Sequence, residues 1–413
     1  MKEEHPMQLT NFETQNTRTI LAEWRREVKY NNIDEFWKSA QRNIKELLRG
    51  LLERTMQEEL LIYTGRAWNQ KLNQKIDYRN GYYYRDLLTP YGNMSKLKVP
   101  RLRKTRLKTT VFKNYQRRTK AVDRALKDIF LAGVSTRRVG EALSCLLDAP
   151  VSATTVSKVT KTLDKEVRKF QNKELLDEYQ YTILDGINLK VKEGLQYKKK
   201  CVLAAYGITF LGIREIISFR QVNKETKLAW LAFLNDLYKR GLQGKNLSLI
   251  TVDGQKGLLS ALDEIYPFIP IQRCWAHKLR NVVGYLPRKR QKECSSQAAS
   301  IYNAQSRQEA IKQFKIWKRK WNKVSQKAVH CLEKDLEYMF RHFDCPKEHR
   351  KKIRTTNAIE RSFREVRRRV RTMSCFSNAA SCDRIIFAIF NHLNKHWKEH
   401  PFKRFNQLEE TQL

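Results

Sequence analysis

Apolar residues repeat with two different spacings along this chain, which predicts helices in some regions and strands in others. Within residues 1–75 they recur every three or four positions, for example at Ile44, Leu47, Leu48 and Leu51, as on one face of an amphipathic helix. Such a face must be buried in a small bundle, at an interface between subunits or against DNA. We therefore expect residues 1–75 to form a helical region for DNA binding or dimerisation.

Residues 76–118 have an extended pattern instead. Short apolar runs flank Asn80-Gly81 and Gly92, and an Asn-Gly pair favours a tight turn, so we expect short strands or extended arms around it. Lys and Arg, interleaved with aromatic and apolar residues, continue to residue 120. This is typical of a surface that follows phosphates and also of a solvated run of charge.

Residues 119–175 are predicted to form three helices, at 121–131, from Ser135 to about 146, and at 154–170 with Ser152 as its cap. A short helix, a turn and a further helix is the layout of the helix-turn-helix, whose last helix enters a major groove. A plain three-helix bundle has the same pattern. Both interpretations stay open, and DNA binding is the one that the charge of the chain favours.

Residues 176–274 switch to apolar runs with a period near two, broken by glycines. The order strand, strand, strand, helix, strand, helix, strand predicts an α/β fold with helices packed on a mixed sheet. Residues 275–350 read as helical, and residues 351–413 contain two more helices. The sheet domain is thus interrupted by an all-helical insertion. The expected strands are 181–191, 200–212, 214–222, 247–252 and 268–272, and the expected helices between them are 225–240 and 256–265.

The charge of the chain points to a polyanionic partner. Lys and Arg number 82 against 43 Asp and Glu, a formal net charge of +39 over 413 residues, so nucleic acid is the expected partner, ahead of a membrane surface or a ribosome-like assembly. No apolar stretch approaches the roughly 20 residues of a membrane span, no signal peptide is visible, and eight cysteines lie at irregular spacings. We expect a soluble cytoplasmic protein with reduced cysteines.

Three acidic residues stand at positions where one site could gather them. Asp185 and Asp253 each end an apolar run and precede a glycine, and Glu360 begins a helix three residues after Asn357. Taken singly, the aspartates can begin turns and Glu360 can complete a capping box. Taken together, they could supply the oxygen ligands that Mg²⁺ requires, and two such ions promote phosphoryl displacement.

Arginines follow Glu360 on the same predicted helix. Its apolar stripe consists of Ile359, Phe363, Val366 and Val370. Because one helix cannot supply counter-ions for so many guanidinium groups, we predict that this basic face contacts DNA phosphates, with a solvated basic face as the alternative. The candidate DNA-binding residues are Arg361, Arg364, Arg367 and Arg368, together with Arg101 and Arg103 of the earlier basic segment.

Two Cys/His pairs have a spacing that suits a metal. Cys274 and His277 are three apart, as are His342 and Cys345, and the four side chains would complete a tetrahedral zinc site. The alternative, which we favour, is that a buried cysteine and a hydrogen-bonded histidine tie the insertion to the sheet.

Four motifs, in order, resemble those of the IS256/Mutator-type DDE transposases. They are Asp185-Gly-Ile-Asn-Leu-Lys-Val, Val252-Asp-Gly-Gln-Lys-Gly-Leu, Gln272-Arg-Cys-Trp-Ala-His-Lys-Leu-Arg-Asn and Thr355-Thr-Asn-Ala-Ile-Glu-Arg-Ser-Phe-Arg. The upstream Arg79-Asn-Gly-Tyr and Val99-Pro-Arg-Leu-Arg are also similar, whereas Phe376-Ser-Asn lacks the central proline of many members.

This resemblance implies an RNase H-like catalytic domain with an all-helical insertion before the glutamate. It implies that Asp185, Asp253 and Glu360 are catalytic metal ligands, with Cys274, His277 and Asn357 in support. Our hypothesis is that Asp185 bridges two Mg²⁺ ions and that Asp253 and Glu360 hold one each, with Mn²⁺ able to substitute. The implied partners are terminal inverted repeats, target DNA and a second copy of the chain in a homodimer.

The implied function is metal-dependent DNA cleavage followed by transfer of the 3′-hydroxyl to target DNA. Three alternatives remain: an RNase H-like nuclease or resolvase without strand transfer, a domesticated DNA-binding protein without catalysis, and a basic structural protein. The three intact carboxylates argue against the second alternative, and the ordered motifs argue against the third.

Overall fold

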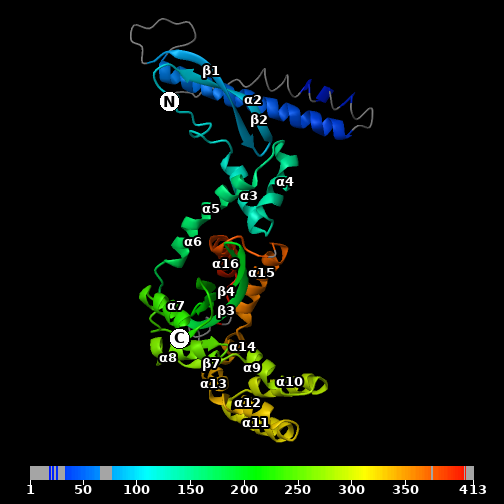
Figure 1. Ribbon diagram of the computed structural model, residues 1–413, viewed down its shortest axis with the longest axis vertical. Coiled ribbons are helices and arrows are strands. Elements are labelled where there is room, and N and C mark those ends of the chain that lie inside the picture. The colour runs from blue at the N-terminus through cyan, green and yellow to red at the C-terminus, as the bar shows by residue number, and fades with distance from the viewer. Residues whose placement is uncertain are drawn as a thin grey trace, which may run out of the picture. The chain divides into compact units, whose positions relative to one another are not determined.

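The computed structural model describes residues 18–19, 21–22, 25–26, 33–65, 77–373, 375–403 and 405. Its residues separate into two compact units (Figure 1). Unit 1 contains residues 1–130 and 135–160, and unit 2 contains residues 131–134 and 161–413. The six-part division expected from the sequence stays a prediction, and the parts of it at residues 1–17 and 66–76 lie outside the described residues.

A long helix packed on a β-hairpin forms the first half of unit 1. Helix α2 (Ile33–Thr64) contains the predicted amphipathic repeat, and strands β1 (Arg79–Thr89) and β2 (Gly92–Leu102) pair antiparallel. One face of α2 packs on the hairpin, while Ile44, Leu47 and Leu51 remain exposed. The shared core contains Met56, Leu87, Met94, Leu97, Val99 and Phe112.

The turn predicted at Asn80-Gly81 is wrong. Both residues lie inside β1, and the chain reverses between Thr89 and Gly92. Gly81 has φ +64°, and the pairing register shifts between Arg79 and Tyr82. The left-handed glycine therefore makes a bulge within the strand instead of a turn between two strands.

Three short helices complete unit 1: α3 (Lys120–Leu131), α4 (Thr136–Leu147) and α5 (Ala153–Lys161). The predicted caps are confirmed, since Ser135 Oγ accepts from Arg138 N–H and Ser152 Oγ accepts from Thr155 N–H. The single helix predicted for 154–170 is wrong, because the chain forms α5 and then α6 (Leu163–Gln171). Frequent β-branched residues weaken the helix near this junction.

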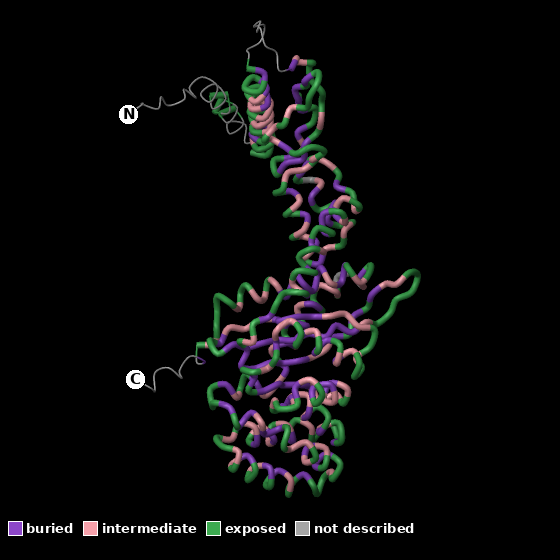
Figure 2. Tube along the Cα trace, turned by 90° about the vertical axis from the view of Figure 1, so that its left-hand side faces the viewer, coloured by how far each residue is buried: buried purple, intermediate pink, exposed green. Residues whose placement is uncertain are grey.

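A five-stranded mixed sheet forms the centre of unit 2. The strand order is β5-β4-β3-β6-β7: the first three strands are antiparallel neighbours, while β6 and β7 run parallel to β3. Buried residues follow these strands (purple in Figure 2). The strands are β3 (Tyr179–Glu193), β4 (Gln196–Thr209), β5 (Arg214–Val222), β6 (Leu249–Val252) and β7 (Ile271–Arg273). The α/β class and the mixed sheet predicted from the sequence are confirmed.

Helices cover both faces of this sheet. On one face, α7 (Lys227–Lys239) and α8 (Lys256–Ile265) share a core with the strands, including Leu184 and Val252. On the other, α15 (Asn357–Met373) and α16 (Ala379–Glu399) pack on β3, β4 and β5, where Phe219 meets Phe390 edge-to-face. No helix in the described part of the chain is long and apolar enough to cross a membrane.

The segment between β7 and α15 is helical and has its own core around Trp275, Trp317 and Trp321. Its elements are α9 (Trp275–Val283), α10 (Arg288–Tyr302), α11 (Arg307–Asn322), α12 (Gln326–Glu333), α13 (Leu336–Phe340), the 3-10 turn η1 (Arg341–Asp344) and α14 (Lys347–Ile353). We call this segment the helical insertion.

Candidate active site

The sheet brings Asp185 and Asp253 to neighbouring positions. Strand β3 runs parallel to β6, and Leu184 pairs with Val252, so the aspartates follow paired residues on adjacent strands. Leu184 and Val252 point into the core beneath α7 and α8, and because side chains alternate along a strand, Asp185 points to the other face. Each aspartate is fixed by a backbone donor: Gly186 N–H to Asp185 Oδ1 at 2.8 Å, and Gln255 N–H to Asp253 Oδ1 at 2.9 Å.

Glu360 reaches the same site from the first turn of α15. Thr356 precedes this helix, and its hydroxyl lies 3.1 Å from Glu360 Oε1. His277 Nε2 lies 3.5 Å from the same oxygen, and Arg280 lies 3.8 Å from Oε2. The capping box expected between Asn357 and Glu360 is wrong, because Asn357 is the first helical residue and is exposed. Its supporting role stays a prediction.

Cys274 and His277 hold the start of α15 in place. The buried Cys274 Sγ accepts from Thr356 N–H at 3.2 Å and lies 3.3 Å from the Thr356 hydroxyl, which is also 3.2 Å from His277 Nδ1. Nearby, Trp275 N–H donates to Arg354 O at 3.1 Å. We call the group Cys274, His277 and Thr356 the clasp; it joins the beginning of α9 to the helix that carries Glu360.

Burial and charge at the site favour a cation. Burial, reinforced by the negative charges of Asp253 and Glu360, raises the pKa of Asp185 to about 7, against the opposing effects of Gly186 N–H and His277. The hydrogen bond with Cys274 raises the pKa of His277. A bound divalent cation would favour the ionised form of a carboxyl group whose pKa is raised by burial and by neighbouring carboxylates.

The donor set fits Mg²⁺ better than zinc, since all three predicted ligands are carboxylates. Among the residues that the structure describes, one group of three or more potential ligands has its atoms within 4.8 Å of one another, namely the exposed His396, Glu399 and His400. Asp185, Asp253 and Glu360 are therefore spread more widely than that group.

A fourth carboxylate, Glu225, lies beside this group and was not predicted. Its Oε1 accepts from Trp230 Nε1–H at 3.1 Å, and its backbone oxygen accepts from the side chain of Gln255. Burial, and next the negative charge of Asp253, raise the pKa of Glu225. Residue 225 precedes α7 in the sequence without a strand end or a motif, so only the packing of α7 against α8, whose N-cap residue is Gln255, could have indicated it.

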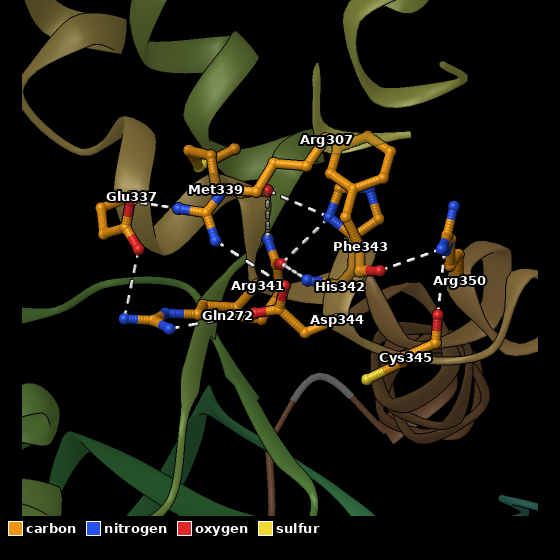
Figure 3. A network of polar contacts seen from close by, with 10 residues as sticks. All are labelled: Gln272, Arg307, Glu337, Met339, Arg341, His342, Phe343, Asp344, Cys345 and Arg350. Atoms are coloured by element: carbon orange, nitrogen blue, oxygen red, sulfur yellow. Dashed lines mark hydrogen bonds and ion pairs between the residues drawn. The ribbon is translucent and has the colours of Figure 1, made fainter. Parts of the chain in front are cut away.

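The structure does not assemble the four proposed zinc ligands. Cys274 and His277 belong to the clasp, and His342 is used elsewhere (Figure 3). His342 Nδ1 lies 3.0 Å from Met339 O and 3.1 Å from Gln272 Oε1, which also accepts His342 N–H. Burial and the charge of Arg354 lower the pKa of His342 to about 3. As favoured from the sequence, this histidine ties the helical insertion to β7.

The predicted DNA-binding arginines lie in both units. On α15, Ile359, Phe363 and Val366 are buried as predicted and Val370 is partly buried, while Arg361, Arg364, Arg367 and Arg368 are exposed. Arg368 pairs with Glu365 at 3.2 Å; in the described part of the chain no ion pair involves Arg361, Arg364 or Arg367. Arg101 and Arg103 are exposed in unit 1. Contact of these arginines with DNA stays a prediction.

Comparison with known proteins identifies relatives along most of the chain. A family model described as "Transposase, Mutator family" matches residues 21–400. The transposase for insertion sequence element ISRM5 of Rhizobium meliloti (strain 1021) is 32% identical over 86% of this chain and 89% of its own length. The transposase for IS256 in transposon Tn4001 of Staphylococcus aureus is 32% identical over 86% of this chain and 90% of its own length.

One solved structure is a more distant match. A chain of the simian T-cell lymphotropic virus intasome in complex with PP2A regulatory subunit B56 gamma is 12% identical, and the match covers 50% of this chain and 63% of that chain. Its TM-score is 0.17, which is too low to support a conclusion about the fold.

Proposed function

This chain belongs to the Mutator family of transposases, and from that premise we propose that it is the DNA transposase of an insertion sequence. In this proposal it binds the terminal inverted repeats, cuts one DNA strand at each end and joins the freed 3′-hydroxyl to target DNA. The observation that carries the proposal is the proximity of three carboxylates from distant segments: Asp253 follows β6 beside Asp185 of β3, and the charges of Asp253 and Glu360 both act on Asp185.

We infer that unit 2 has an RNase H-like fold. The support is the mixed sheet, with three antiparallel strands followed by two strands parallel to β3, and the helical insertion between Asp253 and Glu360. Asp185 lies within β3 and Asp253 directly follows β6, each one residue beyond the paired Leu184 and Val252 of a shared hydrophobic core, so a well-packed sheet holds them in place.

Asp185, Asp253 and Glu360 are the residues that would hold Mg²⁺ ions. Bound there, the ions would supply Lewis acidity that activates the attacking water or 3′-hydroxyl and neutralises charge on the phosphate. The backbone N–H groups of Gly186 and Gln255 orient the aspartates, and the clasp orients Glu360. Arg361, Arg364 and Arg367, exposed on the same helix as Glu360, would contact the phosphates on either side of the cut.

The two DNA ends must be held together for transfer, so we also propose a homodimer. Unit 1 would bind the inverted repeats, using the basic segment of Arg101 and Arg103. Both points are extensions from the family and from the charge of the chain.

The test is one incubation of the purified protein with labelled element ends, target plasmid and Mg²⁺, in which nicked and joined products are resolved. We expect both products. Asp185→Asn should abolish both while end binding persists. Nicking without joining would indicate a nuclease, and binding without nicking a regulator; cleavage retained by Asp185→Asn would remove the assignment of the three carboxylates.

A further inference from the structure

A groove in unit 1 contains features that binding to duplex DNA does not explain. It has a volume of about 1060 Å³ and lies between the β1–β2 hairpin and the following loop, residues 103–117. This exceeds the roughly 300–1,000 Å³ of sites for drug-sized ligands, so more than one nucleotide fits. We infer that this groove binds unpaired nucleotides of single-stranded DNA; the choice of DNA rests on the proposed function.

Two tyrosines flank the groove. Tyr83 on β1 is 40% exposed, and Tyr115 in the loop is 85% exposed. Arg106 lies with them, since its guanidinium is 3.3 Å from the hydroxyl of Tyr115. Tyr115 has φ +60°, a backbone conformation that is strained for a tyrosine. The two rings are thus exposed to solvent, although large aromatic side chains such as tyrosine are usually at least partly buried.

The floor of the groove is apolar. Tyr83 pairs with Val99 on β2, and Val99 and Phe112 are buried in the core shared with α2. The guanidinium of Arg85 stacks 3.9 Å above the ring of Phe112. Flat aromatic and guanidinium surfaces of this kind are what unstacked bases bind.

The rim of the groove is cationic. Side chains alternate along β2, so Arg101 lies on the same side as Val99, and Arg103, just after the strand, also lines the groove. The lining includes six Arg and Lys but one acidic residue, Asp86, which accepts from Lys96 N–H. In the described part of the chain, none of the six forms an ion pair with a carboxylate. A row of uncompensated cations beside exposed rings matches a phosphate backbone with bases turned inward.

Unpaired DNA explains both the exposed rings and the cations of this groove, whereas duplex DNA explains only the cations. The cations would bind the phosphates of either form. In a duplex the faces of the bases are covered by their neighbours, so Tyr83 and Tyr115 would gain little from it. An unpaired strand exposes those faces to stacking, which contributes about 1–3 kcal/mol per base.

The experiment measures binding by fluorescence anisotropy in EDTA, with the full chain and one labelled 20-nucleotide sequence as single strand or duplex. The double variant Tyr83→Ala/Tyr115→Ala should bind the single strand at least about tenfold more weakly, with duplex binding changed less than about twofold. Tyr83→Phe/Tyr115→Phe, which keeps the rings, should bind like the wild type. The control is Tyr197→Ala, an exposed tyrosine of unit 2, which should change neither.

A second pair of substitutions separates charge from stacking. Arg101→Ala/Arg103→Ala should weaken both forms of DNA and lower the slope of log affinity against log salt by about 2. The inference is overturned if the alanine pair at the tyrosines affects both forms equally or neither, or if the phenylalanine pair is as weak as the alanine pair. Because no metal is present, failure of cleavage or joining leaves this result unaffected.

Discussion

The acidic site of unit 2 and the groove of unit 1 are built in opposite ways. Asp185 and Asp253 lie on a sheet whose two faces are covered by helices, and each carboxylate of the site accepts a hydrogen bond from a neighbour. In the groove, Tyr83 and Tyr115 are exposed on a hairpin and a loop, and among the described residues the surrounding cations have no carboxylate partner. Chemistry requires fixed geometry, within about half an ångström, whereas binding of varied DNA does not. We expect substitutions to affect rate in unit 2 and affinity in unit 1.

The largest effect should follow removal of charge at the acidic site. Glu360→Gln keeps the size of the side chain but loses a metal ligand, so several kcal/mol of charge stabilisation are lost. We expect single-turnover cleavage to slow on the order of 1,000-fold, with affinity for single-stranded DNA unchanged. A Glu360→Gln protein that cleaves at a rate near the wild type would show that the site does not depend on this carboxylate.

A smaller loss should follow damage to the clasp. Thr356→Val removes the hydroxyl that lies beside Glu360, His277 and Cys274 and preserves the shape of the side chain. Groups that orient metal ligands contribute about 10–100-fold, so we expect cleavage to slow by that factor and the Mg²⁺ concentration for half-maximal rate to rise. Thr356→Ser should restore both quantities; if it does not, the loss reflects packing and not orientation of Glu360.

The basic face of α15 belongs to unit 2, but substitutions there should change affinity for DNA, as in the groove of unit 1. Arg361→Ala/Arg364→Ala removes two exposed charges next to Glu360 without touching the buried stripe. We expect roughly tenfold weaker binding of duplex ends and a salt slope lower by about 2. The comparison variant is Arg368→Ala, whose guanidinium already pairs with Glu365 and should matter less. If Arg368→Ala weakens binding as much as Arg361→Ala/Arg364→Ala does, phosphate contact by Arg361 and Arg364 is contradicted.

The smallest effect concerns the histidine that ties the helical insertion to the sheet. The pKa of His342 is about 3 in the folded chain, lowered by burial, against about 6.5 when unfolded. Between pH 6.5 and about 3, His342 therefore binds a proton in the unfolded chain but stays neutral in the folded chain. The stability contributed by neutral His342 is present above that pH and is lost as the pH falls from about 6.5 towards 3.

Urea unfolding followed by tryptophan fluorescence measures this contribution. Between pH 7.5 and 5.5 the wild type should lose about 1 kcal/mol more stability than His342→Gln, which cannot titrate. His396→Gln, at an exposed position of α16, should follow the wild type. Parallel curves for His342→Gln and the wild type would show that His342 does not link protons to folding.

Local signals in the sequence predicted the residues of the central part of the acidic site. An apolar run that ends in Asp-Gly marked Asp185 and Asp253, and the stripe of Ile359, Phe363 and Val366 set the orientation of α15. The strand order, however, came from the structure, because the pairing of β3 with β6 joins residues nearly 70 positions apart (Leu184 and Val252). Periodicity within a strand carries no information about its neighbour.

Other features depend on packing and were not predictable. Glu225 joins the site only because the start of α7 lies beside the start of α8, and the groove of unit 1 exists only because the loop after β2 folds back over the hairpin. Gly81 shows a third case: the same Asn-Gly pair that favours a hairpin turn makes a bulge when the strand continues past it. In each case a tertiary contact decided between outcomes that the local sequence allowed.

The clasp also has a consequence for how the molecule tolerates change. Polypeptide leaves the sheet at Cys274 and returns at Thr356, and these two residues touch. The roughly eighty residues between them begin and end at this contact, so their number does not set the distance that Glu360 must span. Loop-closure entropy grows only slowly with length. Natural or engineered replacement of the helical insertion by a shorter or longer segment should therefore preserve the position of Glu360, provided that the contact between Cys274 and Thr356 is kept.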